Sequence, residues 1–462
     1  MSETLTHKAP QKAVLPKSWW GEMRALLWIG VPMALAQFIQ FFVYFIDTVM
    51  IGRISPEDVA AAGLGSVIYF ALWMLGSGPI AAVSPLVSQA LGADQNDTRD
   101  ARRSVRMVIW VIFLMTPLIV ILLSFTEELL LAFGQDAEVS AKAGKYVMAL
   151  AIGLPFAMAT MALRNFLAAL EKTLVPLILV VIGTATNGLL NYIFIFGNFG
   201  APRLELVGAG IASSLAYIFS FCLFLLYIRL DKRANSFQIF KNFWKSDWQR
   251  FREVIILGWP ISLTTVFEGM LFNAAIIIMG LIGVLEAAAY QIALNVAALA
   301  FMLPWGMSMA GAVRIGLAEG ASNKPATRRA ASTTMTASVL AIMLLAIPVA
   351  LFPEFTASLY LNLEKAENAE VIALVIGFLP IATAFMFFDA IQVSANQLLR
   401  GLKDVNWPML FTGISYWIVG FPVAYILALK TDIGANGVWY GLMSGLIMAS
   451  ILLGLRLMRR LK

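Results

Sequence analysis

Long apolar runs dominate this chain, and short polar segments separate them. A helix that crosses a membrane needs about 20 mostly apolar residues. Twelve runs reach such a length, and they predict helices at residues 25–51, 59–91, 107–126, 144–163, 174–197, 207–228, 254–282, 285–318, 332–353, 370–396, 408–429 and 437–456. The pattern therefore predicts an all-α integral membrane protein with twelve transmembrane helices.

The composition supports this prediction. Of the 462 residues, 60% are hydrophobic and only 13% are charged, whereas a soluble domain averages about 45–50% apolar and about 25% charged residues. The polar N-terminal segment lacks the small-residue cleavage site of a signal peptide before the first apolar run. We therefore expect residues 25–51 to be retained as the first transmembrane helix.

The distribution of basic residues predicts the orientation. With the N-terminus placed inside, most of the 33 Lys and Arg residues fall in the inner segments. Cytoplasmic loops carry such an excess, so we expect both termini in the cytoplasm of a cell whose inner membrane holds the protein. The net charge of +6 is thus a topology signal and does not indicate a nucleic-acid partner. The longest loop, residues 229–253, is rich in aromatic and basic residues and suits either a membrane-surface segment or a linker.

Cysteine and histidine are nearly absent from the sequence. Cys222 is the single cysteine and His7, in the polar tail, is the single histidine. A disulfide within the chain and a His-rich metal site are both excluded, and most hydrolytic or transfer chemistry is disfavoured. We expect no enzyme activity and no cofactor.

The two halves of the sequence resemble each other. Residues 30–93 align without a gap on residues 258–321, and the helix-breaking residues match best. Gly30 and Pro32 fall on Gly258 and Pro260, and the later matches are Gly52 with Gly280, Gly78 with Gly306, and Gly92 with Gly320. Further along, Leu170, Pro176 and Gly188 fall on Leu402, Pro408 and Gly420.

An even number of helices in each half makes the two repeats parallel, related by an axis along the membrane normal. We expect a cytoplasmic tail at 1–24, an N-terminal six-helix lobe at 25–228, a cytoplasmic inter-lobe loop at 229–253, a C-terminal six-helix lobe at 254–456 and a cytoplasmic tail at 457–462. Two bundles that rock about a central cleft give alternating access, so the repeat favours a transporter.

Three carboxylates interrupt apolar runs: Asp47, Glu268 and Asp389. An acid at the centre of a membrane helix costs about 2.5–3.5 kcal/mol on insertion scales, so it usually faces an interior or an aqueous path. Such a group can exchange protons, bind sodium or neutralise a cationic solute. Asp47 lies only about one turn from Gly52, so a solvated interfacial acid remains an alternative there.

Polar side chains recur at helical spacing around these acids. The one-sided sets are Gln37, Gln40, Tyr44 and Asp47; Thr184, Asn187 and Asn191; Thr264 and Glu268; Gln291 and Asn295; and Asp389, Gln392 and Asn396. They predict a wet interior, although single amides also serve as structural hydrogen-bonding groups between membrane helices. We expect Arg314, by contrast, to lie at the inner end of its helix and to snorkel toward water.

Several of these motifs resemble the MATE family of multidrug exporters, closest to its NorM branch. The stretch Phe45 to Gly52 after Gly30-Val31-Pro32 resembles the family's first helix. Other matches are Phe267-Glu268, Tyr290 to Asn295, Asp389 to Val393, Arg400 to Asp404, and Ser415 to Pro422. The resemblance spans the whole chain in order.

The resemblance implies an inner-membrane antiporter that exports organic cations in exchange for Na+ or H+ and works as a monomer. It places cation coupling at Glu268 and Asp389 in the C-terminal lobe, and at Asp47 with Asn187 and Asn191 in the N-terminal lobe. If the coupling ion is Na+, we expect it at Glu268, Asp389 or Asp47.

Two positions depart from the family pattern. Relatives often carry His where Tyr290 stands, and Tyr where Phe385 stands. The second change removes a hydroxyl that can bind sodium, so the choice between sodium and protons stays open.

Other function classes fit less well. A flippase for a lipid-linked oligosaccharide, in the same superfamily, would favour cationic cavity residues for its pyrophosphate, whereas this chain places acids there. A membrane acyltransferase would normally carry His or Cys within a span. A channel does not require two repeated halves. A major-facilitator transporter shares the topology, but the loop from Gly92 to Arg106 lacks that family's Gly- and Arg-framed motif.

Overall fold

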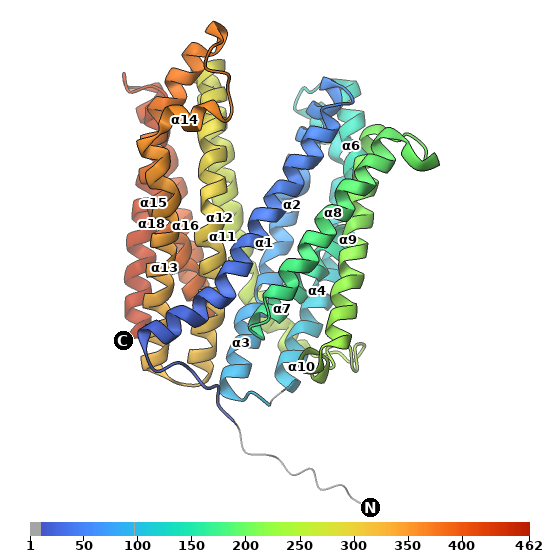
Figure 1. Cartoon of the computed structure of the whole chain (residues 1–462), viewed down its shortest axis with the longest axis vertical. Helices are drawn as coiled ribbons and strands as arrows, with labels where there is room; N and C mark the ends of the chain where they lie inside the picture. The colour runs from blue at the N-terminus through green and yellow to red at the C-terminus, as the bar shows by residue number, and fades with distance from the viewer. Residues whose placement is uncertain (1–10, 97) are drawn as a thin grey trace, which may run out of the picture.

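The computed structural model describes residues 11–96 and 98–462, and every regular element in these ranges is a helix (Figure 1). His7 and the first part of the predicted tail lie outside the described residues. The first helix begins where the sequence offers a cap, because the Ser18 side chain accepts a hydrogen bond from the Gly21 amide. The second begins at Pro56, after Ser55 caps it in the same way.

The first half of the chain forms ten α-helices and one short 3-10 turn. They are α1 (Trp19–Ile51), α2 (Pro56–Ala81), α3 (Val83–Ala93), α4 (Thr98–Ser124), α5 (Thr126–Ala132), α6 (Ala137–Ala151), α7 (Leu154–Ala169), α8 (Leu174–Phe196), η1 (Asn198–Gly200), α9 (Glu205–Leu230) and α10 (Lys232–Ser236).

The second half repeats this plan. Its elements are α11 (Trp248–Ile282), α12 (Val284–Gly320), α13 (Lys324–Leu351), α14 (Pro353–Ser358), η2 (Ala366–Asn368), α15 (Ala369–Gly401), α16 (Asn406–Gly413), η3 (Ile414–Gly420), α17 (Phe421–Leu429) and α18 (Asn436–Leu461). The element η3 is a π-helical turn that joins α16 to α17.

Within the described residues, eleven helical segments are long and apolar enough to cross a membrane, and α6 with α7 makes up to twelve. The predicted all-α membrane fold is confirmed. The predicted single helix at 144–163 is instead bent by 47° between α6 and α7. Pro155, just after the bend, has no backbone N–H to donate within the helix. The Gly153 amide donates instead to the Ser214 hydroxyl of α9 at 2.9 Å.

The helices form two bundles that meet toward the end where α1 begins and α18 ends, and they separate toward the opposite end (Figure 1). Helices α1 and α11 cross between them. The first part of α11 packs on α2 and α4 of the first half, and the first part of α1 packs on α12 and α13 of the second half. Trp19 of α1 accordingly donates a hydrogen bond to Ser332 of α13 at 3.1 Å.

The bundles touch at the glycines that match in the repeat. A Cβ atom added to Gly78 would lie 2.1 Å from the Gly258 carbonyl oxygen and 2.5 Å from the Ser262 amide. In the other half, a Cβ atom on Gly306 would lie 2.3 Å from the Cα atom of Ala34. Ser262 and Ala34 are themselves repeat-equivalent, so the two contacts are related by the pseudo-two-fold axis.

A second matched pair lies nearer the termini. A Cβ atom on Gly92 would lie 2.2 Å from the Leu317 carbonyl oxygen, and one on Gly320 would lie 2.1 Å from the Gln89 carbonyl oxygen. These four residues are also related by the repeat. Both pairs bring backbone against backbone, which only glycine permits, and small residues are the usual means of close helix packing in membranes.

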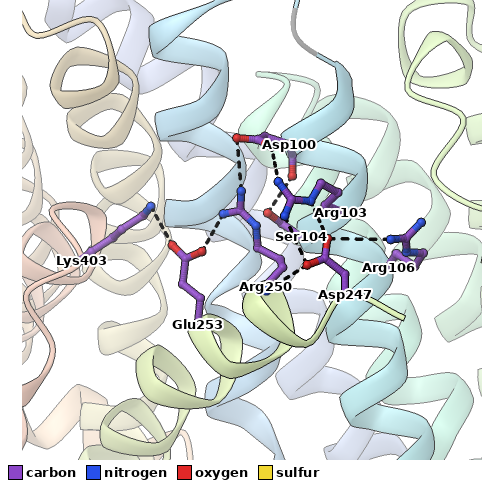
Figure 2. A network of polar contacts seen from close by, with 8 residues as sticks. All are labelled: Asp100, Arg103, Ser104, Arg106, Asp247, Arg250, Glu253 and Lys403. Carbon is purple, nitrogen blue, oxygen red and sulfur yellow. Dashed lines mark hydrogen bonds and ion pairs between the residues drawn. The ribbon is translucent and has the colours of Figure 1, made fainter. Parts of the chain in front are cut away.

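The contact between the bundles that contains Gly78, Gly92, Gly306 and Gly320 is called the seam below. An ion-pair network joins the two halves of the chain at one end of this seam (Figure 2). Arg103 of α4 pairs with Asp247, the N-cap residue of α11, at 2.5 Å. Arg250 of α11 pairs with Asp100 of α4 at 3.2 Å and with Glu253 at 2.8 Å. The network therefore ties the first half of the chain to the start of the second half.

Arg314 makes a second cross-connection, and the expectation that it snorkels is wrong. Its side chain is 4% exposed and binds Glu22 of α1 at 2.6 Å, together with Glu171 in the connection between α7 and α8. Glu22 is 1% exposed. A buried charge needs such compensation, so Arg314 holds three elements together at the interface.

Replacing Gly78 with alanine should destabilise the protein, because the new methyl group would overlap the backbone of α11. We expect the free energy of unfolding to fall by about 1–3 kcal/mol, the usual cost of overpacking. Gly280→Ala is the matched control, since nothing lies within 4 Å of a Cβ atom at Gly280 in the neighbouring helix α11. Denaturation in detergent measures both, and equal stability of the two variants would contradict the proposed contact.

The Arg103–Asp247 pair should contribute stability at neutral pH. Hydrogen bonds from the Arg103 guanidinium lower the pKa of Asp247, against the opposing effect of burial. The contribution should therefore be lost as the pH falls below about 4, the ordinary value of an aspartate, through the lower value of the folded protein.

A double-mutant cycle of Arg103→Gln and Asp247→Asn measures this contribution. We expect a coupling free energy of about 0.5–3 kcal/mol at neutral pH, and none in acid. The exposed pair Arg203–Glu205 is the control, where we expect about 0–1 kcal/mol. A coupling that is the same at both pH values would show that the charge of Asp247 is not responsible.

Candidate functional site

Helices α11 and α15 bring two of the predicted acids together inside the second bundle. Asp389 of α15 is 6% exposed and Glu268 of α11 is half-buried. The two carboxylates interact electrostatically, and Glu268 also interacts electrostatically with the Arg400 guanidinium. Gln392, one turn along α15 from Asp389, is fully buried. Two acids thus share one polar region, where like charges repel unless a cation or proton compensates them.

Buried polar atoms without a partner concentrate in the same bundle. Among the described residues, the side chains of this bundle with such atoms are Tyr290, Arg329, Asp389, Gln392, Asn396, Thr412, Ser415, Tyr416 and Trp439. Buried polar groups are almost always hydrogen-bonded in proteins. These oxygens and amides are therefore available to an ion, a proton or water.

The π-helical turn η3 supplies two of these groups, Ser415 and Tyr416. Tyr416 is 1% exposed and interacts electrostatically with both Glu268 and Asp389. The Trp417 indole donates to the Phe267 carbonyl oxygen at 3.3 Å and so fixes the turn against α11, next to Glu268. Single π-helical turns occur frequently at functional sites, and this one brings Tyr416 within electrostatic range of both acids.

The first bundle contains a cavity of about 130 Å³ beside Asp47. Besides Asp47, its polar and aromatic lining consists of Tyr44, Thr48, Ser66, Tyr69, Phe70, Tyr146, Ser213 and Tyr217. A carboxylate surrounded by aromatic rings suits a positively charged group, because the ring faces attract cations.

A chain of hydrogen bonds connects Asp47 to the amides predicted to accompany it. Asn191 donates to the Asp47 carboxylate at 2.5 Å and to the Asn187 side-chain oxygen at 3.3 Å. Asn187 in turn donates to the Ser213 hydroxyl at 3.1 Å. Helices α1, α8 and α9 thus meet at one polar centre, and the structure places Asp47, Asn187 and Asn191 together.

The polar face of α1 continues toward the other bundle. Gln40 is exposed and its side-chain oxygen accepts a hydrogen bond from Arg164 of α7 at 2.9 Å. Gln37 is 6% exposed and lines, with Arg164 and Met309 of α12, a cavity of about 10 Å³. Arg164, assigned to an inner loop from the sequence, thus lies within a helix at the junction of the bundles.

Among the described residues, no hydrogen bond connects the other predicted polar residues to the three acids. Thr184 and Thr264 donate to carbonyl oxygens of their own helices, at 2.9 and 2.8 Å. Gln291 is exposed on α12 and Asn295 is half-buried there. Tyr290 is fully buried against the Trp439 ring, with ring centroids 5.1 Å apart.

Most hydroxyl groups around the acids were not predicted from the sequence. Tyr69, Tyr146, Ser213 and Tyr217 lie in otherwise apolar runs, where one sequence does not separate an interior face from a lipid-facing one. Ser415 and Tyr416 were named only as part of the segment Ser415 to Pro422, which resembles the MATE family. The adjoining glycines Gly413 and Gly420 were the available clue that the helix there packs closely.

Sodium binding at these centres would rely on oxygen atoms of mixed kinds. Among the described residues, no group of three or more His, Cys, Asp and Glu side chains is arranged to hold a metal ion. The acidic pair and its neighbouring hydroxyl and amide oxygens nevertheless match a hard cation, which prefers oxygen ligands. The same groups can also accept a proton, so the donor set fits either ion.

Sequence comparison identifies relatives of the whole chain. The MatE family model matches residues 32–193 and 260–426, one stretch in each half. The probable multidrug resistance protein NorM of Mesorhizobium japonicum is 38% identical over 443 residues, which cover 96% of this chain and 95% of that protein. The protein of the same description from Rhizobium meliloti is 39% identical over 445 residues, with the same coverage.

Solved structures share the fold at lower identity. An outward-facing multidrug resistance MATE transporter of the MOP superfamily superposes with a TM-score of 0.86 at 19% identity, covering 95% of this chain and 96% of that one. The eukaryotic MATE transporter AtDTX14 gives a TM-score of 0.83 at 21% identity, with the same coverage. With the family model matched in both halves and NorM relatives aligned along nearly its whole length, the chain belongs to the MATE family of multidrug efflux transporters, secondary active antiporters rather than enzymes.

Proposed function

We propose that this transporter exports organic cations in exchange for Na+ or H+, with separate cation sites in its two halves. The observation that carries the proposal is the pair of unlike polar centres. One holds Glu268 and Asp389 among buried unpartnered oxygens, and the other holds Asp47 beside an aromatic cavity. Both lie in segments that are otherwise apolar. An acid inside the membrane costs free energy, and it therefore usually marks a functional site.

The Glu268–Asp389 centre suits the coupling ion. The two carboxylates interact unfavourably when both are charged, and a bound cation or proton removes that repulsion. Gln392, Ser415 and Tyr416 offer further oxygen atoms. Arg400 partly balances the charge of Glu268, which favours binding of a single monovalent ion over a more highly charged one.

The Asp47 cavity suits the cationic end of a substrate. Tyr44 and Tyr217 line it next to the carboxylate, and aromatic faces add to the attraction for a positive group. Its volume of about 130 Å³ accommodates an ammonium or a small ring rather than a whole drug molecule. The rest of a substrate would extend toward the exposed part of α1.

Exchange follows if each ligand favours a different arrangement of the bundles. A ligand shifts a conformational equilibrium only by the difference in its affinity for the two states. The matched glycine contacts leave the bundles joined near one end, and the polar centres lie beyond that seam. Ion binding at Glu268 and Asp389 would then favour an arrangement in which Asp47 releases the substrate.

The location and boundaries follow from the charge distribution. We place the protein in the inner membrane with both termini in the cytoplasm, because the inner segments carry most of the basic residues. The end at which the bundles separate would then face outward. We propose lobes at 25–228 and 254–456, joined by the loop 229–253, and a monomeric transporter.

Neutralising the coupling acids should reduce export. For Glu268→Gln and Asp389→Asn we expect the rate of export of a fluorescent organic cation from vesicles to fall about tenfold or more, within the usual range of coupling between sites. Glu319→Gln, at an exposed position near the end of α12, is the control. If both variants exported the dye as fast as the unmodified protein, these acids would not be the coupling residues.

Separately imposed ion gradients should identify the coupling ion. In proteoliposomes, we expect an opposing gradient of either Na+ or H+ to accelerate cation transport, and Glu268→Gln to remove that acceleration. Dye flux is measured with each gradient alone and with neither. Acceleration that persists in Glu268→Gln would move the coupling site elsewhere, for example to Asp47.

A further inference from the structure

Arg164 in the first half and Arg400 in the second half have different electrostatic surroundings. Helices α7 and α15 are equivalent in the repeat, and Arg164 and Arg400 lie near their ends. With Leu170 matched to Leu402, Arg400 corresponds to Ala168, one helical turn from Arg164 and on the same face. Each half therefore directs one guanidinium from the same face of equivalent helices.

The partners of these arginines are also equivalent in the repeat. Arg400 interacts electrostatically with Glu268, whereas Arg164 donates a hydrogen bond to Gln40. Gln40 and Glu268 occupy matching positions when residues 30–93 are aligned on 258–321. The second half thus sets a carboxylate against its arginine, and the first half sets a neutral amide there.

The positive charge of Arg164 is consequently left without compensation. Among the described residues, no carboxylate forms an ion pair with it, and its one hydrogen bond goes to the neutral Gln40 side chain. The other N–H groups of Arg164 do not belong to the buried polar atoms without a partner. Arg164 as a whole is half-buried and lies beside the exposed Gln40.

Arg164 lies where the two bundles meet. The small cavity next to Arg164 is lined by residues of α1, α7 and α8 from the first half and by Met309 from the second half. Arg164 and Asp47 both adjoin the polar face of α1, on which Gln40 and Asp47 are seven residues apart, about 10 Å at 1.5 Å per residue. One face of α1 thus has a negative group at one end and a positive group at the other.

We propose that Arg164 binds the carboxylate of amphoteric substrates, molecules that carry an ammonium and a carboxylate together. The inference rests on the proposed function, since the ammonium of such a molecule would occupy the Asp47 cavity. A guanidinium presents several N–H donors in a plane and recognises a carboxylate through two parallel hydrogen bonds. The substrate carboxylate would replace the Gln40 side-chain oxygen as the acceptor for Arg164, or it would accept a further hydrogen bond from the Gln40 amide.

A matched pair of dyes tests this assignment. The probes are a rhodamine zwitterion with a free carboxylate and its methyl ester, which is a simple cation of nearly the same shape. Binding to the purified protein is measured by fluorescence anisotropy, and transport is measured in proteoliposomes. The variants are Arg164→Gln and Arg164→Lys, with Arg203→Gln as the control for loss of one positive charge at an exposed site.

We expect Arg164→Gln to weaken zwitterion binding and transport about tenfold or more, the effect of losing a hydrogen bond to a charged group. The methyl ester should bind and move at nearly the unmodified rate, which also shows that the variant is folded. Arg164→Lys should weaken zwitterion binding to a lesser degree, because lysine keeps the charge and loses the paired geometry. Arg203→Gln should change neither dye.

Two outcomes would overturn the proposal, and a third would separate it from the proposed function. If Arg164→Gln weakened both dyes equally, Arg164 would only hold α1 in place through Gln40. If ester transport by the unmodified protein depended on chloride, and Arg164→Gln removed that dependence, the anion would be a small ion rather than a substrate carboxylate. If neither dye were transported but zwitterion binding still required Arg164, the proposed function would fail for these dyes and the anion site would stand.

Discussion

The close approach of helix backbones at the matched glycines is the constraint on which the rest of the structure depends. Within a lipid bilayer there is little hydrophobic drive to bring helices together, so packing has to come from complementary surfaces. Gly78 and Gly306 place α2 and α12 directly on the backbones of α11 and α1. The ion pairs of Arg103 and Arg314 then close the same seam nearer the termini. Beyond the seam, the two polar centres are built from residues of single bundles.

This division explains why the two halves agree in shape and differ in chemistry. The seam uses residues from both halves in equivalent roles, so a change in one half has to suit the other. The polar centres lie within single bundles and carry no such restriction. Glu268 stands where the first half has Gln40, and Asp47 stands where the second half has Ala275. The repeat therefore preserves the glycines and leaves the acids free to diverge.

Most of the fold was predictable because the bilayer leaves few alternatives. A long apolar run has to become a helix, since only internal hydrogen bonds satisfy its backbone there. The bend at Gly153 was not predicted, although Pro155 is a signal for it, because the Ser214 hydroxyl that accepts the Gly153 amide belongs to a distant helix. The burial of Arg314 was missed for the same reason: its carboxylate partners, Glu22 and Glu171, are remote in sequence and resemble ordinary loop or helix-end residues.

The candidate site was predictable only in part. Acids and amides in apolar runs are conspicuous, and helical spacing by itself places Asp47 on one polar face and Asn187 with Asn191 on another. The tyrosines of the Asp47 cavity were not separable from lipid-facing aromatics. The π-helical turn that presents Tyr416 depends on packing against α18, where a Cβ atom on Gly445 would lie 2.9 Å from the Ser415 carbonyl oxygen. No local pattern in the sequence encodes that contact.

The exchange of α1 and α11 between the bundles bears on the origin of the chain. The start of α1 packs on the second half and the start of α11 packs on the first half, and the glycine contacts between the bundles occur in pairs related by the two-fold axis. Such an interface is isologous, the kind formed by two copies of one subunit. A six-helix ancestor with these glycines could have assembled as a symmetric dimer through the same surfaces. Gene fusion would then have preserved the interface while releasing each half to evolve a binding site of its own.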